Sequence, residues 1–223
     1  MARYTGPVVK ISRREGIPLS PKAERYFNKH KDGVAPPGQH AHARPGKPSE
    51  YSKRLREKQK ARHFFGILEK QFRRYFKDAS HMKGNTGENL LRLLETRLDN
   101  VVRRLGFAVS MPGARQLVGH GHVLVNGKRV DIPSFRVEPD DRITLAEAMR
   151  TNVQVRKSLQ EAVSRGLPGW LTWEDGLVEM VRKSEEAGRL EGPAMAGKLK
   201  QWPAREEMSL PVNEQFIVEL YSK

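Results

Sequence analysis

The chain has 223 residues and carries 41 Lys and Arg against 26 Asp and Glu, a formal net charge of +15 at pH 7. The length allows one or two domains with a hydrophobic core, and the charge favours a polyanionic partner, nucleic acid before an anionic membrane. Cysteine is absent, which excludes disulfides and thiolate metal sites, and no apolar run is long enough to cross a bilayer.

Residues 1–47 are expected to be irregular, because Pro and Gly recur and the stretch 36–47 cannot form a regular helix. The basic residues predict an arm that becomes ordered on a phosphate surface, with a solvated, disordered tail as the alternative. The apolar residues interspersed among them could anchor the segment and favour the arm. The first residues lack the apolar stretch of a secretory signal, so we expect a cytoplasmic protein. The local histidines are weak metal ligands by spacing: His30, His40 and His42.

A helix is predicted over residues 49–62, with Ser49 as its N-cap and Glu50 in its first turn. Tyr51 and Leu55 give it only a narrow apolar stripe. A charged run is usually a solvated face, but cations at this density repel one another unless an anion lies nearby, which favours contact with an RNA backbone. The cations are Lys53, Arg54, Arg56, Lys58, Lys60 and Arg62.

The next helix is predicted over residues 67–79. Its aromatic stripe, which includes Phe72 and Phe76, is more often core than a platform for stacked bases. Arg73 lies outside this stripe and is a candidate RNA contact.

A long amphipathic helix is expected from about residue 89 to Leu105, because apolar residues recur at steps of three and four. Thr86 is its expected N-cap, and Gly106 stands where a left-handed C-cap belongs. Glu95 and Asp99 are interpreted as ion-pair partners of neighbouring arginines rather than as acid–base groups, with Asp99 and Arg103 forming an i,i+4 pair.

A short helix should follow, capped by Ser110, with Pro112 in its first turn and Gly121 at its end. Asn126-Gly127 is the strongest short-range signal for a type I′ turn, which predicts a tight hairpin. Basic and amide side chains are expected to form one RNA-facing surface where the helix meets the hairpin: Arg115, Gln116, His120, His122, Asn126 and Lys128.

The remaining elements are predicted as a strand at 142–145, a helix at 152–165 and a short strand at 169–173. Residues 174–200 are polar and rich in Gly, and we interpret them as an insertion that forms a surface excursion. The end of the chain, where Phe216, Val218 and Leu220 alternate with other residues, predicts a strand or an extended tail docked on a core.

Catalytic constellations are missing. Gly121 and Gly127-Lys128 do not match a phosphate-binding loop, because five residues intervene rather than four and Arg129 stands where Ser or Thr must hold magnesium. His120 and His122 lack further metal ligands nearby. We therefore expect no enzyme activity, no cofactor and no metal.

Several motifs resemble the bacterial uS4 family of small-ribosomal-subunit proteins. They are Leu-Leu-Glu-Thr-Arg-Leu-Asp-Asn-Val-Val at 93–102, Ala-Arg-Gln-Leu-Val-Gly-His-Gly-His at 114–122 and Val-Asn-Gly-Lys at 125–128. The resemblance continues in Arg-Arg-Glu-Gly at 13–16, in Pro-Pro-Gly-Gln-His at 36–40 and at the end of the chain. Some family members hold zinc with four Cys near the N-terminus, so this chain resembles the zinc-free branch.

The resemblance implies an α+β fold in which a helical domain, with an extended N-terminal arm and a docked C-terminal tail, holds an inserted S4 RNA-binding domain built α-α-β. The implied boundaries are 1–47 for the arm, 48–88 plus 201–223 for the helical domain, and 89–200 for the inserted domain, with the S4 module at about 97–160. Met111-Pro112-Gly113 replace one or two basic residues that the family usually has before Ala-Arg-Gln. The alternative donors to a phosphate are then the N-terminal N–H groups of the short helix.

The implied function is that of a structural constituent of the small ribosomal subunit in the cytoplasm. Such a protein binds 16S rRNA early in assembly, nucleates the subunit body, contributes to translational accuracy, neighbours protein S5 and lies near the mRNA entry channel. The alternative is an RNA-modifying enzyme or a free RNA-binding regulator that uses an S4 domain. The expected rRNA contacts are Arg3, Lys10, Arg13, Arg14, Gln39, His40 and Lys47, together with the cations of 49–62, Arg73 and the helix–hairpin cluster.

Overall fold

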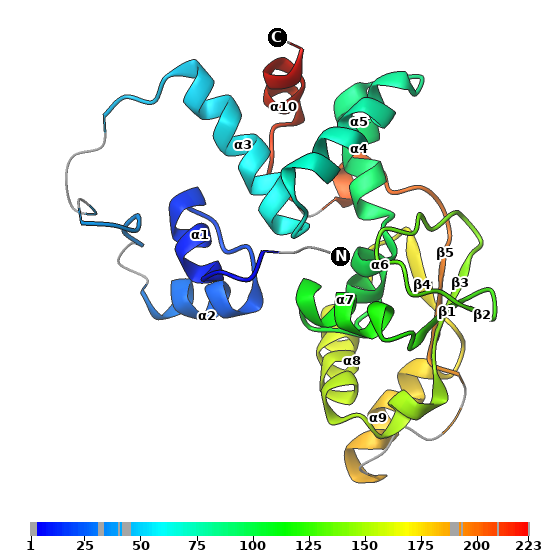
Figure 1. Cartoon of the computed structure of the whole chain (residues 1–223). Helices are drawn as coiled ribbons and strands as arrows, with labels where there is room; N and C mark the ends of the chain where they lie inside the picture. Colours follow the sequence, from blue (N-terminus) through cyan, green and yellow to red (C-terminus); the bar gives the residue numbers. More distant parts are fainter. Residues whose placement is uncertain are drawn as a thin grey trace. The chain divides into compact units, whose positions relative to one another are not determined.

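The computed structural model describes residues 4–30, 34–39, 41, 46–187, 192, 194–208 and 210–222. The chain forms two compact units: unit 1 is Met1–Leu91 with Ser209–Lys223, and unit 2 is Arg92–Met208 (Figure 1). The expected α+β class is confirmed, because helices dominate unit 1 whereas unit 2 adds an antiparallel sheet. In the described part of the chain, no helix has the length and apolar character needed to span a membrane.

Unit 1 is helical. Its elements are α1 (Val8–Glu15), α2 (Pro21–Lys29), α3 (Glu50–Phe64), α4 (Glu69–His81), the first turns of α5 (Thr86–Glu95) and α10 (Glu214–Tyr221). The predicted helices at 49–62 and 67–79 are confirmed as α3 and α4. Ser49 caps α3 by accepting from Ser52 N at 3.2 Å, as expected. Phe72 is buried in this unit, in agreement with its predicted core role, whereas Phe76 is only partly buried.

The expectation of an irregular segment over residues 1–47 is wrong for α1 and α2. Pro and Gly bound these helices rather than preventing them: Pro7 precedes α1, and Gly16 ends it in the left-handed conformation at φ 72°. Ser20 caps α2, and Pro21 occupies its first position, where no N–H is needed.

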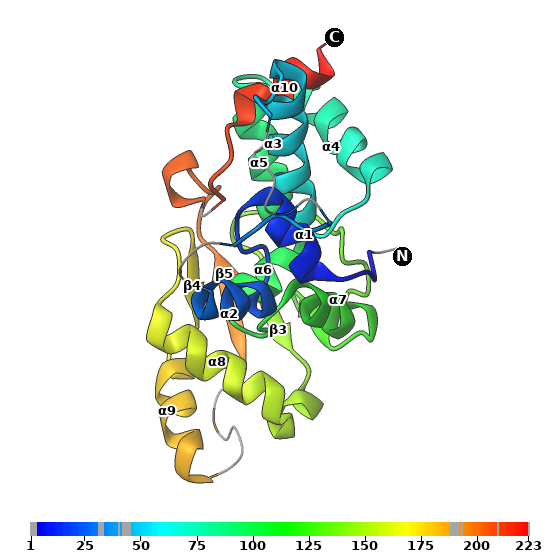
Figure 2. The ribbon, with the colours of Figure 1, turned by 90° about the vertical axis from the view of Figure 1, so that its left-hand side faces the viewer.

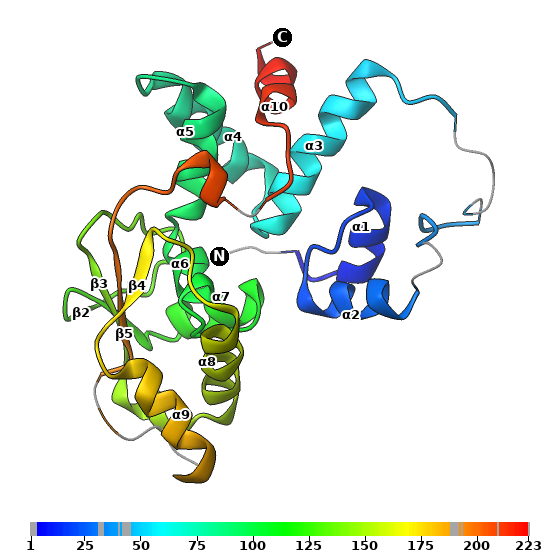
Figure 3. The same ribbon diagram turned by 180° about the vertical axis from the view of Figure 1, so that it is seen from behind.

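The expected C-terminal strand is also wrong, because the segment forms α10, which packs against α3 (Figure 3). Asn213 caps it by accepting from Gln215 N at 3.0 Å. Ile217 is fully buried, and Tyr221, one helical turn further on, stacks on Phe76 with ring centroids 4.7 Å apart. The spacing that decides the docking is therefore i,i+4 rather than the alternation read from the sequence.

Unit 2 contains α6 (Leu98–Arg104), α7 (Met111–Gly119), α8 (Val153–Arg165) and α9 (Leu177–Ala187), with short 3₁₀ turns η1 (Glu147–Thr151) and η2 (Arg205–Glu207). Its strands are β1 (Val123–Val125), β2 (Lys128–Arg129), β3 (Arg142–Leu145), β4 (Leu171–Trp173) and β5 (Ala196–Leu199). They form one antiparallel sheet in the order β2-β1-β3-β5-β4. Figure 2 shows α8 and α9 side by side, and both contribute buried side chains to the core.

The long helix expected through residue 105 is broken into α5 and α6. Arg97 leaves the helix and pairs with Arg136 in an isolated antiparallel bridge, while Leu98 N donates to Phe135 O at 2.9 Å. Neither Pro nor Gly marks this break, and apolar residues continue at helical spacing on both sides of it. The sequence therefore gives no sign that the helix ends here. The cap of α5 is Asn85 rather than Thr86, because Gly87 N donates to Asn85 Oδ1 at 2.9 Å.

The described residues of the segment 174–200 do not form a surface excursion, contrary to expectation. They supply α9 and the inner strand β5, and their buried side chains include Leu177, Met180 and Leu199. Gly197 fits between neighbours because a Cβ there would stand 2.5 Å from Leu105 Cδ2 and 2.9 Å from Thr172 O. The segment therefore completes the core of unit 2.

Candidate nucleic-acid interface

The cations of α3 are paired within unit 1. Every one of the six has a carboxylate neighbour: Lys53–Glu50 at 2.7 Å, Arg54–Glu219 at 2.7 Å, Arg56–Glu15 at 2.9 Å, Lys58–Glu69 at 2.9 Å, Lys60–Glu57 at 2.5 Å and Arg62–Glu69 at 3.8 Å. The argument that RNA must supply the missing anions is therefore wrong, because the fold brings carboxylates from α1, α4 and α10 to this helix. Much of the charge on α3 holds unit 1 together.

Glu69 shows this structural role most clearly. It accepts from Lys58 Nζ at 2.9 Å and from Tyr221 Oη at 2.7 Å, which ties α4 to α3 and to α10. Burial raises the pKa of Glu69, but the hydrogen bonds from Tyr221 and Lys58 outweigh burial, so the net pKa lies below its ordinary value. Burial and the bond to Glu69 raise the pKa of Tyr221, which stays protonated as a donor.

A positively charged cleft opens between α1 and α3. It has a volume of about 360 Å³, and Lys10 and Arg14 of α1 face Arg56 and Arg62 of α3 across it. Lys10 and Arg14 are exposed, and within the described ranges neither forms an ion pair. Cations without carboxylate partners are the ones able to meet a phosphate without first breaking an internal pair. The other lining residues are Tyr4, Pro7, Ile11, Glu15, Gln59 and His63.

Other expected contacts of unit 1 are dispersed. Arg13 donates to the carbonyl oxygens of Ala35 at 2.9 Å and Pro36 at 3.2 Å, so it holds the following chain to α1. Three of the expected contacts are exposed: Gln39, Lys47 and Arg73. Arg3 and His40 lie outside the described residues.

Unit 2 carries a second candidate surface at α7 and the β1–β2 hairpin. Ser110 caps α7, and the hairpin turns through Asn126 at φ 50° and Gly127 at φ 79°, as predicted. Asn126 is tied to the start of β3, because its Oδ1 accepts from Arg142 N at 2.9 Å and its Nδ2 donates to Asp141 at 2.7 Å. Lys128 is exposed on β2. The hairpin tip is therefore fixed in place before any ligand binds.

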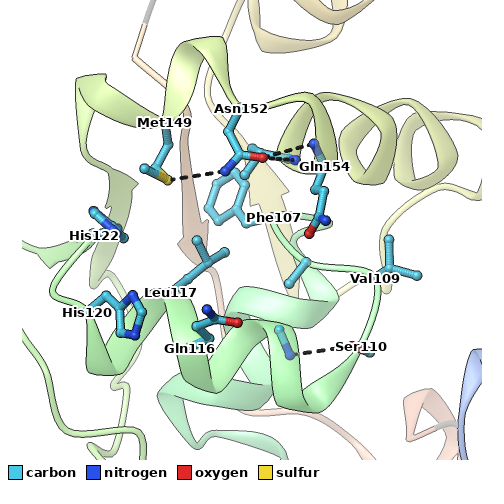
Figure 4. A pocket seen from close by; sticks show the side chains of 13 residues that line it. Phe107, Val109, Ser110, Gln116, Leu117, His120, His122, Met149, Asn152 and Gln154 are labelled. Atoms are coloured by element: carbon cyan, nitrogen blue, oxygen red, sulfur yellow. Dashed lines mark hydrogen bonds between the residues drawn. The ribbon is translucent and has the colours of Figure 1, made fainter.

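A hollow of about 210 Å³ lies on this side of α7. Figure 4 shows the side chains that line it. Gln116, His120 and His122 lie at its edge, and Phe107 and Leu117 contribute apolar surface within it. These are the amide and imidazole groups that the sequence placed together. Leu117 is only partly buried, whereas its neighbour Val118 is fully buried.

Arg115 departs from that cluster. Its side chain is 10% exposed, and its Nε donates at 2.8 Å to Oδ2 of Asp99, which also accepts from Arg97 Nη2 at 2.7 Å. The expected position of Arg115 on an open surface is therefore wrong, because the break before α6 places the buried carboxylate of Asp99 within its reach. Asp99 pairs with these two arginines rather than with the predicted Arg103.

A second internal pair lies beside the first. Glu95 is almost fully buried and accepts from Arg104 at 2.6 Å and from Asn100 Nδ2 at 2.6 Å, which confirms its predicted ion-pair role. Burial, followed by the charge of Arg104, lowers the pKa of Arg103 to about 10.

No cluster of three or more His, Cys, Asp or Glu side chains suited to a metal occurs among the described residues.

Two family models and many full-length relatives match this sequence. The model of the ribosomal protein S4/S9 N-terminal domain matches residues 3–95, and the model of the S4 domain matches residues 96–143. The small ribosomal subunit protein uS4 of Thermus thermophilus is 47% identical over the full length of both chains. The proteins of the same name from Chlorobium limicola and Citrifermentans bemidjiense are 47% and 49% identical, also over both full lengths.

The chain belongs to the uS4 family. The uS4 N-terminal model covers α1 to α5 and therefore the whole α1–α3 cleft. The S4 model covers α6, α7 and the hairpin, and it ends within β3. The elements α8, α9, β4 and β5, which complete the sheet and core of unit 2, lie beyond both models.

Sequence reasoning missed two of the four residues by which α3 lines the cleft, Gln59 and His63. They follow Arg56 by three and seven positions, so helical geometry places all three on one face of α3. The spacing was readable in the sequence, but the cleft exists only because α1 packs on that face, and α1 was expected to be irregular.

Proposed function

We propose that this chain is a structural constituent of the small ribosomal subunit that binds the rRNA of that subunit. The observation that carries the proposal is the 47–49% identity over the full length of proteins named small ribosomal subunit protein uS4. The net charge of +15 suits a polyanionic partner. The relatives bear the name of a ribosomal protein rather than of an enzyme, which disfavours the RNA-modifying alternative.

The finer assignments rest on the family resemblance. We propose that the protein binds 16S rRNA directly and early, that it nucleates the body of the subunit and contributes to translational accuracy, and that it lies next to protein S5 and the mRNA entry channel in a cytoplasmic ribosome. We also retain the arrangement in which a helical domain, completed by the C-terminal residues, carries an inserted RNA-binding domain.

The geometry supports a revised set of RNA contacts. On unit 1 the favoured residues are the cations without internal partners, Lys10 and Arg14, with exposed Lys47 and Arg73 as further candidates. On unit 2 the favoured set is Gln116, His120, His122, Asn126 and Lys128. Arg115 and the fully paired Lys58 are assigned to the scaffold, because binding RNA through them would break buried ion pairs.

Reconstitution tests this function. Purified small-subunit proteins lacking uS4 should assemble fully with 16S rRNA only when this chain is added, and the chain alone should protect a defined rRNA region in chemical footprinting. A free regulator would bind RNA without entering the particle. A chain that neither enters particles nor protects 16S rRNA would contradict the proposal.

A further inference from the structure

The cleft between α1 and α3 of unit 1 has the features of a binding site for one anionic group. Its charged walls come from two helices that pack against each other. Each carboxylate nearby already has a cationic partner, because Glu15 accepts from Arg56 through Oε1 and Glu69 accepts from Lys58. Lys10 and Arg14 remain at the rim without an ion pair among the described residues. Cations therefore outnumber carboxylates around the cleft.

His63 lies in the wall of this cleft and is held neutral. An arginine has only donors, so the 3.2 Å contact from Arg62 Nη2 to His63 Nε2 requires the imidazole to accept there, with its proton on Nδ1. Burial, and after it the charges of Arg62, Arg56 and Arg14, together lower the pKa of His63 to about 4. The tyrosine ring of Tyr4 covers one edge, with centroids 6.2 Å apart.

An anion bound in the cleft would reverse the electrostatic effect that the surroundings have on protonation of His63. Arg56, Lys58 and Arg62 face it from α3 and Arg14 faces it from α1, and all four disfavour a proton on the ring. Arg62 Nε is buried without a hydrogen-bond partner among the described residues, so it has a donor to offer. A phosphate would take up these donors, offset their charge and leave Nε2 free to be protonated and donate in turn.

We propose that this cleft binds a phosphodiester group of rRNA and that His63 takes up one proton from solvent as the phosphate enters. The proposal rests on the proposed function for the identity of the RNA, but the site is defined by residues of unit 1 alone. Lys10 and Arg14 attract the anion, Arg62 shifts its hydrogen bond from the imidazole to a phosphate oxygen, and the imidazolium becomes an additional donor. RNA affinity should then increase as the pH falls.

The first test uses the full chain and inorganic phosphate, without RNA. NMR titration of the imidazole of His63, identified by its loss in His63→Gln, should show a higher pKa in phosphate than in chloride at the same ionic strength. His81, which is exposed on α4, is the internal reference and should titrate alike in both salts. Identical His63 curves in the two salts would overturn the phosphate site, whatever the rRNA result.

The second test measures 16S rRNA binding at about pH 7.5 and 5.5. Linkage gives a rise in affinity of up to about tenfold per pH unit for one proton taken up on binding. The affinity of the unmodified protein should therefore rise at least about 3-fold more on acidification than that of His63→Gln, even if the proton is taken up only in the lower part of this range. His81→Gln should behave as the unmodified protein does. Glu15, whose pKa burial raises, also faces the cleft, but it is present in both proteins and cancels in the comparison.

Substitutions of single cations test whether the rim of the cleft is needed for phosphate to act on His63. Arg14→Gln should abolish the phosphate-induced change at His63, whereas Arg74→Gln, an exposed cation on α4, should leave it intact. Thermal melting should show that all variants are folded. If rRNA binding is absent but phosphate still raises the pKa of His63, the site stands and the proposed function fails; equal pH dependence of His63→Gln and the unmodified protein would remove His63 from the mechanism.

Discussion

At the scale of single residues, Asp99 is a fully buried charge at the centre of an ion-pair cluster in unit 2. Its side chain has no exposed surface, and it accepts hydrogen bonds from Arg97 and Arg115. Charges buried in this way persist only when they are paired and hydrogen-bonded. Sequence reasoning recognised Asp99 as an ion-pair partner but chose Arg103, which lies one turn further along the same helix. The partners are instead Arg97, at a helix break that leaves no mark in the sequence, and Arg115 of α7.

Removing this carboxylate should destabilise the fold more than removing one of its partners. Asp99→Ala is expected to lower the free energy of unfolding by about 3–5 kcal/mol, because two buried guanidinium groups lose their counter-charge. Arg115→Ala should cost less, since Arg97 still pairs with Asp99. Urea unfolding followed by tryptophan fluorescence measures both, with exposed Lys128→Ala as a control expected within about 0.5 kcal/mol of the unmodified protein. Equal losses for Arg115→Ala and Lys128→Ala would contradict the scaffold role of Arg115.

At the scale of elements, the short segments were hardest to predict. The hairpin followed from Asn126-Gly127, because a type I′ turn needs positive φ at both positions. The strand β5 did not follow, because Gly197 and the polar, Gly-rich stretch that precedes β5 in the sequence are typical of a loop, and the strand is defined by its pairing with β3 and β4. The same holds for α10, in which Phe216 and Val218 suggested an alternation that only the docking of Ile217 and Tyr221 overrides.

Gly197 in β5 should not tolerate a side chain. A Cβ at this position would approach Leu105 Cδ2 to 2.5 Å and Thr172 O to 2.9 Å, so Gly197→Ala must displace the core or the neighbouring strand. Overpacking of this kind costs roughly 1–3 kcal/mol. The matched control is Gly119→Ala, which meets nothing within 4 Å in α7 and should be neutral or slightly stabilising. Chemical unfolding of the two variants tests whether β5 is packed as described.

The docking of α10 predicts which of its residues are essential for stability. Ile217→Ala should cost about 2–5 kcal/mol, the usual range for truncating a buried aliphatic side chain. Gln215→Ala, at an exposed position on the same helix, should change stability little. Calorimetric melting distinguishes the two, and a larger loss for Gln215→Ala would indicate that the segment docks in another way.

The bond between Tyr221 and Glu69 should give this docking a dependence on pH. The pKa of Glu69 is lower in the folded chain than its ordinary value of 4.5, so its contribution is present above that value and is lost as the pH falls below it. The difference in melting temperature between the unmodified protein and Tyr221→Phe should therefore shrink between pH 5 and pH 3. A difference that stays constant over this interval would exclude the ionised carboxylate as the acceptor.

At the scale of the whole molecule, the excess of cations sets the character of binding. The ion pairs of α3 reduce the number of charges available to RNA, but 41 cations against 26 carboxylates leave a surplus after pairing. Affinity for 16S rRNA should fall linearly with salt on a log–log scale, with a slope of roughly 0.7–0.9 for each phosphate contacted. Filter binding between about 50 and 200 mM salt tests this. Little change over that range would mean that charge is not what holds the complex together.

The return of the C-terminus to unit 1 has a consequence for synthesis of the protein. Unit 2 is continuous in sequence, whereas unit 1 is closed by contacts such as Tyr221 to Glu69 and Asn213 to Glu57, which join residues about 150 positions apart. A chain emerging from the translating ribosome therefore exposes all of unit 2 before α10 appears. We expect unit 2 to fold first during translation, and unit 1 to become stable only after the last residues are released.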